Sequence, residues 1–181
     1  EFVELKSTTA NFSLDGYVLV FFNETNNLSY FAIDLDEFTT DVNGIIHFGA
    51  SGVSPSPAAI LGSTIQNGPD AVAIYLGNDT DFPINTTATT SNLIDAVAYG
   101  TSSTQPTSLM TALGTTVFNN ETTTHPRSSQ RKNDGSWETK VPTPGANNDG
   151  SGVVLNYISV TVPQTSYNEG ESFYVTFTTS E

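Results

Sequence analysis

Short stretches of alternating apolar and polar residues, separated by turn residues, run along most of this chain. Such alternation puts successive side chains on opposite faces of a strand. Gly, Asn and Pro bound the stretches, as at Asn43-Gly44, and no long segment repeats with a helical period. The pattern predicts an all-β chain with strands spaced as in a β-sandwich. The stretches are residues 1–5, 14–23, 28–35, 45–50, 71–76 and 93–99.

The sequence DAVA occurs twice, in IQNGPDAVAIYLG and in NLIDAVAYG, and each copy is soon followed by a tyrosine. If both are strands, one face of the first carries small side chains and a tyrosine, and the other face carries branched ones. The first set is Ala71, Ala73 and Tyr75, opposite Val72 and Ile74; in the second strand Ala96 and Ala98 alternate with Val97 and Tyr99. The sequences flanking the two copies differ. We therefore interpret the two DAVA sequences as two strands that pack in a similar environment, and not as copies of a repeated unit.

The domain organisation follows from two further segments. Residues 107–114, TSLMTALG, contain the one helical turn that we expect, with Gly114 ending it. Residues 147–152, NNDGSG, read as a linker, after which alternation restarts in two strands that cannot bury a core alone. We expect a β-sandwich over residues 1–148, a linker at 149–152, and at 153–181 the opening strands of a truncated second β domain. Because EFVEL reads as a strand entered midway, we also expect an N-terminal part outside this sequence.

The order of the motifs is EFVEL, LDGYVLVFFN, DVNGIIHFG, IQNGPDAVAIY, LIDAVAYG, QRKNDGSW and PTPGANN. This order resembles the lamin tail domain as it occurs in bacterial secreted proteins, from residue 1 to about 148. The resemblance implies an immunoglobulin-like β-sandwich, with no catalytic residues attached to the domain itself. It also implies neighbours such as secreted nuclease or phosphoesterase domains, or a place on a cell-surface multidomain chain. The family usually has one more strand before EFVEL, and the residues from 153 resemble the start of a Calx-beta or similar immunoglobulin-like repeat.

Composition restricts the classes of partner. The 181 residues include 19 acids and 5 bases, so the formal net charge is −14. Such a chain should be repelled by nucleic acid and by anionic membranes, and it should attract cations or basic partners. It has no cysteine, and its longest apolar run, Tyr17–Phe22, is far shorter than the ~20 residues of a membrane span. We expect an extracellular or bacterial cell-surface location without membrane insertion.

Acidic turns are the candidate metal sites, because calcium prefers carboxylate and carbonyl oxygens. The EF-hand spacing fails: a loop starting at Asp34 needs Gly where Thr39 stands. We therefore interpret these acids as solvated turns and keep calcium as the alternative; no other cofactor is expected. The candidate ligands are Asp34, Asp36, Asp41 and Asn43 in one region and Asp79 and Asp81 in another.

The candidate ligand-binding residues form a basic cluster beside the sole tryptophan. Four of the 5 bases lie between residues 127 and 140, and the candidates are Arg127, Arg131, Lys132 and Trp137. Cations next to an aromatic ring could take a phosphate, a nucleic-acid strand or an acidic glycan. The resemblance implies a structural role instead, with Arg131 anchoring a loop and Trp137 filling one end of the sandwich core.

Motifs for catalysis are missing from the sequence. It has no G-x-S-x-G nucleophile elbow and 2 histidines, of which we expect His47 to be half-exposed in a strand and His125 to lie in a loop. We therefore expect a non-catalytic immunoglobulin-like module for binding, adhesion or spacing in a secreted or surface multidomain protein. The alternative is a substrate-binding accessory domain of an extracellular nuclease or phosphoesterase. A protein or glycan partner is expected over nucleic acid, and an unpaired edge strand could support a homodimer.

Overall fold

The computed structural model describes residues 1–62, 64–100, 105–116, 118–120 and 126–149. The chain divides into two units, Glu1–Asp149 and Gly150–Glu181. The strands expected in residues 153–181 lie outside the described residues, as does His125. All the strands and helices that the structure describes belong to the first unit.

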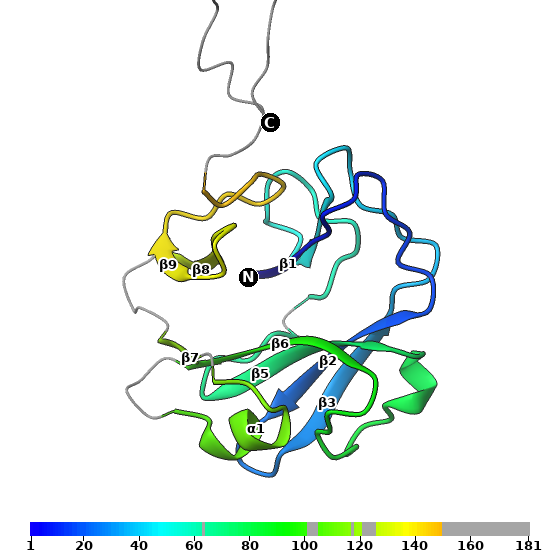
Figure 1. Cartoon of the computed structure of the whole chain (residues 1–181), viewed down its shortest axis with the longest axis vertical. Helices are drawn as coiled ribbons and strands as arrows, with labels where there is room; N and C mark the ends of the chain where they lie inside the picture. Colours follow the sequence, from blue (N-terminus) through cyan, green and yellow to red (C-terminus); the bar gives the residue numbers. More distant parts are fainter. Residues whose placement is uncertain (63, 101–104, 117, 121–125, 150–181) are drawn as a thin grey trace, which may run out of the picture. The chain divides into compact units, whose positions relative to one another are not determined.

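A five-stranded sheet forms the centre of this unit (Figure 1). Its strands pair antiparallel, except for the parallel pair of β6 and β7. The fold is therefore mostly β with antiparallel sheets, as the alternation predicts, and it includes one short helix within the described residues. In spatial order the strands are β3 (Leu28–Asp34), β2 (Tyr17–Asn23), β5 (Asp70–Leu76), β6 (Leu93–Gly100) and β7 (Phe118–Asn120).

Two smaller sheets and two helical segments complete the described elements. The first sheet pairs β1 with β4, and the second pairs β8 with β9. Their bounds are β1 (Phe2–Lys6), β4 (Ile45–Gly49), β8 (Ser128–Arg131) and β9 (Trp137–Lys140), with the 3-10 helix η1 (Asp79–Asp81) and the helix α1 (Thr107–Ala112).

One face of the five-stranded sheet is made of small side chains. The two DAVA strands are the neighbours β5 and β6, and their register places Ala71 opposite Ala98 and Ala73 opposite Ala96. All four alanines lie in one apolar cluster with Leu109 and Leu113, from α1 and the residue after it. The predicted facing of both strands is thus confirmed. The small side chains on this face also have a structural reason, because alanines let a helix approach the sheet closely.

The other face of the sheet carries a second β layer. Leu19 and Phe21 of β2 and Val72 of β5 share a buried cluster with Ile46 and Phe48 of β4. These residues alternate with those of the helix-facing cluster, so β2 and β5 are buried on both faces. Figure 1 shows β1 and α1 on opposite sides of the five-stranded sheet, in agreement with the two clusters.

The helix α1 is stabilised from a distant part of the chain. A helix of 6 residues is too short to be stable by itself, and its N-cap residue Pro106 supplies no side-chain bond. Instead, Glu24, just after β2, accepts hydrogen bonds from Ser108 N (3.2 Å) and Leu109 N (3.0 Å). Gly114 follows the helix with φ +65°, the left-handed conformation expected of a helix-ending glycine.

Candidate functional site

The candidate calcium ligands after β3 close local turns. Asp36 Oδ1 accepts a hydrogen bond from Gly16 N at 2.6 Å, and Asp34 Oδ1 accepts one from Asp36 N at 2.8 Å. Each carboxylate therefore has one oxygen engaged with a backbone amide. Such contacts fix the entry to β2 and the exit from β3.

Asp41 and Asn43 form the turn that leads into β4. Asp41 Oδ1 accepts from Asn43 N at 2.7 Å and from Ile45 N at 2.8 Å. Gly44 completes the turn with φ +75°, and a Cβ atom on it would lie 2.2 Å from Ser7 O. Only glycine fits at this position, which explains the Asn43-Gly44 signal in the sequence.

The second acidic region is a capped turn. Asn78 Oδ1 accepts from Thr80 N at 3.2 Å, and Asp81 Oδ2 accepts from Asn78 N at 3.0 Å, which together make a capping box around η1. Asp79 lies in the first turn of η1. Among the described residues no group of three or more His, Cys, Asp or Glu side chains is placed to hold a metal ion. Calcium binding by these turns stays the alternative to their interpretation as solvated turns.

The candidate basic residues lie on the β8–β9 hairpin, where acids face most of them. The Arg131 guanidinium forms an ion pair with Asp95 of β6, and it lies 5.7 Å from the centroid of the Trp137 ring. Lys132 Nζ lies 3.9 Å from Asp134 Oδ2, and Lys140 Nζ lies 2.5 Å from Glu138 Oε1. Arg127 is exposed just before β8. The structure thus brings Arg131 and Trp137 together and partners three of these cations with carboxylates.

Trp137 differs from its expected place. It is half-buried and belongs to neither core cluster, so it does not fill the end of a core between the sheets. Its ring instead packs against Arg131, its register partner on the opposite strand of the hairpin. Arg131 does contact a carboxylate, the side chain of Asp95.

A buried carboxyl that the sequence did not mark as a site lies at the start of β5. Asp70 is 3% exposed, and its Oδ1 accepts from Glu24 N at 3.3 Å. Burial, followed by the nearby charge of Glu24, raises the pKa of Asp70 to about 6, although the bond from Glu24 N opposes this. A pKa this far from the ordinary value is a frequent property of functional carboxyls.

The surroundings of Asp70 favour a structural role for it. Its register partners are Asn23 of β2 and Tyr99 of β6. Both bond Gln66: Asn23 Nδ2 donates to Gln66 Oε1 at 3.1 Å, and Tyr99 donates to Gln66 O at 3.2 Å. Gln66 N in turn donates to the hydroxyl of Tyr30 at 3.3 Å. These side chains bond one another and the backbone, which ties the loop before β5 to the end of the sheet.

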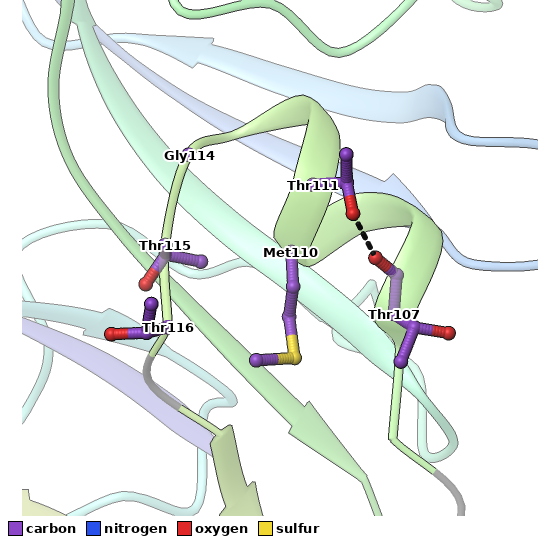
Figure 2. A pocket seen from close by; sticks show the side chains of 6 residues that line it. All are labelled: Thr107, Met110, Thr111, Gly114, Thr115 and Thr116. Carbon is purple, nitrogen blue, oxygen red and sulfur yellow. Dashed lines mark hydrogen bonds between the residues drawn. The ribbon is translucent and has the colours of Figure 1, made fainter.

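Two surface depressions are lined by described residues. The first, of about 430 Å³, is shown in Figure 2 and is lined by Thr107, Met110, Thr111, Gly114, Thr115 and Thr116. Thr111 Oγ1 donates to Thr107 O at 2.9 Å there. None of these six side chains is an acid or a base near neutral pH, so this depression offers no group for proton transfer.

The second depression, of about 330 Å³, is lined in part by Asp41, His47, Ser56 and Gly145. His47 is only 7% exposed, so the expectation of a half-exposed strand histidine is wrong. The outer face of the β1–β4 sheet is covered by loops, and His47 Nε2 lies 3.0 Å from Pro55 O in one of them.

Comparisons with protein-family models, with curated proteins and with solved structures found no match. The lamin-tail resemblance therefore rests on the motifs of the sequence. In the described part of the chain, no helix has the length and apolar character needed to cross a membrane.

Proposed function

We propose that residues 1–148 are a non-catalytic immunoglobulin-like module of the lamin-tail type, which serves binding, adhesion or spacing in a secreted or cell-surface multidomain protein of bacteria. One observation carries this proposal. Six of the eight charged candidate side chains, all except Asp79 and Arg127, bond backbone amides or opposite charges within the same unit, as Asp41 does with Ile45 N and Arg131 does with Asp95.

The proposal follows from what a reaction site requires. A catalytic site needs several polar groups that converge on one open position and are not engaged elsewhere. In the described residues Asp36, Asp41 and Asp81 each accept a bond from a nearby backbone amide, and Asp70 is buried. The middle strands β2 and β5 are covered on both faces, so a partner would meet loops and the outer strands of the sheet. A net charge of −14 favours a neutral or basic protein or glycan partner over one that carries phosphates.

The competing function is substrate binding beside a nuclease or phosphoesterase, through Arg127, Arg131, Lys132 and Trp137. It has less support because a phosphate would have to displace Asp95 from Arg131 and compete with Asp134 at Lys132. The exposed Arg127 and the Arg131–Trp137 contact are what keep this function in consideration.

Trp137 offers a direct test, since it is the only tryptophan and lies within the candidate cluster. Its fluorescence would be followed while the full chain is titrated at low salt with a short single-stranded DNA and, separately, with inorganic phosphate. The proposed function predicts no saturable change. A saturable change that disappears at high salt, and is lost in an Arg127→Ala, Lys132→Ala double variant, would overturn it in favour of the competing function. That variant leaves the Arg131–Trp137 contact intact, so its fluorescence baseline should match the wild type.

A homodimer through a strand edge is also proposed. Among the described strands β1 pairs only with β4, so its other edge could pair with the same strand of a second copy. Light scattering on the purified chain tests this: twice the monomer mass supports it, and a monomer mass over the accessible concentration range contradicts it.

A further inference from the structure

Residues 143–149, here called the exit strap, hold an unusual position for a loop. They lie after the last described strand, β9, and contain no strand or helix. Five of the seven are nevertheless half-buried, namely Pro144, Gly145, Asn147, Asn148 and Asp149. A loop made only to connect two units would be expected to lie open to solvent.

The exit strap is bound to β1 by two side chains of that strand. Glu4 Oε2 accepts a hydrogen bond from Gly145 N at 2.7 Å, and Lys6 Nζ donates to Asn147 Oδ1. Glu4 and Lys6 are two residues apart in a strand, so their side chains point to the same face. This face is opposite to the one that carries Val3 and Leu5, which pack against the core.

The exit strap is also bound to the β8–β9 hairpin. Asn148 Nδ2 donates to Arg131 O at 3.1 Å, and Asp149 Oδ2 accepts from Asn133 N at 3.3 Å. Asn133 Oδ1 lies 3.5 Å from Lys6 Nζ. The strap therefore joins two segments, β1 and the hairpin turn, that are more than a hundred residues apart in the sequence.

Gly145 fits its place closely. Its φ is +77°, and a Cβ atom there would lie 3.2 Å from Pro55 Cγ and 3.7 Å from His47 Cε1. Any larger residue would be strained in this conformation and would press on the loop that holds His47. The glycine of PTPG thus has a specific reason to be there: it lets the strap lie against the covered face of the β1–β4 sheet.

We propose that the exit strap is a clamp, which fixes the chain to β1 and to the hairpin until it leaves the first unit. The first unit is then held together as far as Asp149, and not only as far as Lys140, where β9 ends. Tension applied at Asp149 is thereby carried into β1 instead of peeling β9 from β8. The clamp does not depend on which ligand the module binds.

Hydrogen–deuterium exchange on the full chain tests the clamp. The amides of Gly145 and Ala146 donate to Glu4 Oε2 and Thr143 O, so a peptide covering residues 141–149 should exchange slowly. Glu4→Ala should speed its exchange by about tenfold, since it removes a hydrogen bond to a charged group. Glu4→Gln keeps an acceptor oxygen and should change it less. Lys6→Ala removes the bond to Asn147 Oδ1 and should also speed exchange of this peptide. Its matched control is Lys140→Ala, an exposed lysine of β9 that faces Glu138, which should leave the peptide unchanged.

Exchange of the wild-type peptide at the rate of an unstructured chain would overturn the proposal, as would equal rates in Glu4→Ala and wild type. If Glu4→Ala also accelerates hydrogen exchange in peptides from β2 and β5, the variant is unfolding as a whole. Gly145→Ala then replaces it as the test variant. Gly145→Ala perturbs the clamp from the strap side. It should speed exchange in residues 141–149 and leave β2 and β5 unchanged; no acceleration there would contradict the clamp.

Discussion

Replacing Asp70 by asparagine separates the charge of this side chain from its shape. Asparagine keeps an oxygen that can accept from Glu24 N, as Asp70 Oδ1 does at 3.3 Å, but it cannot ionise. Asp70 is 3% exposed, and burial is the main reason why its pKa rises from 3.8 to about 6. The wild-type protein must therefore ionise a buried carboxyl as the pH approaches neutrality.

The sign and size of the effect are set by linkage. Between pH 3.8 and about 6 the folded protein holds the proton of Asp70 while the unfolded chain has released it. Rising pH therefore lowers the free energy of unfolding through this window, and the loss is complete above it. With ~1.4 kcal/mol for each pH unit of difference, the loss amounts to at most ~3 kcal/mol. Asp70→Asn should have nearly the wild-type stability at pH 4 and should be more stable than the wild type at pH 7.5.

Urea unfolding of both proteins between pH 4 and pH 8 measures this. The quantity to compare is the difference in unfolding free energy between variant and wild type, because the other acids then cancel. That difference should grow in favour of Asp70→Asn as the pH rises to about 6 and then stay constant. A difference that is independent of pH, or an Asp70→Asn protein that is less stable than the wild type at pH 7.5, would refute the reasoning.

Four further substitutions test the packing and the polar contacts of the fold. Leu109→Ala should lower the free energy of unfolding by ~2–5 kcal/mol, because this fully buried side chain packs on the alanine face of the sheet. Met110 is only half-buried, so Met110→Ala should lower it less. Urea unfolding of the two variants measures both changes. Glu24→Ala should cost ~0.5–2 kcal/mol through the lost cap of α1, and equal stability of variant and wild type would contradict that role. Arg131→Gln, which removes the positive charge, should cost less than ~1 kcal/mol, since Arg131 and Asp95 are about half exposed, and the cost should shrink in 1 M salt. A cost that salt does not change would argue against the ion pair.

The period of the sequence predicted β1 to β6, because each of these strands places apolar side chains against a core cluster. This holds even where both faces are buried, as in β5, because small and branched residues alternate there. The period did not predict the short strands β7, β8 and β9, which lack such a run of alternating apolar residues. The Asn43-Gly44 turn and the end of α1 at Gly114 were also predictable, since local backbone conformation demands glycine at both places.

The two aspartates of the DAVA echo show what local sequence cannot predict. Asp70 is buried between β2 and β6, whereas the side chain of Asp95 is 51% exposed. The difference arises because β7 pairs with β6 only from Ala98 onward, which leaves Asp95 near a free edge where Arg131 reaches it. The cap that Glu24 gives to α1 and the contacts of the exit strap also join residues that are far apart in the sequence. A local sequence pattern therefore cannot predict them.

The most direct test of the central claim, that the candidate charged groups serve the fold, is a thermal melt of the full chain in EDTA and in millimolar calcium. A cation bound only by the folded state would raise the melting temperature. The melting temperature should be the same in both conditions, because the carboxylates of Asp36, Asp41 and Asp81 already accept backbone hydrogen bonds. A rise of several degrees with calcium, absent with EDTA, would contradict the claim and make these turns ion sites.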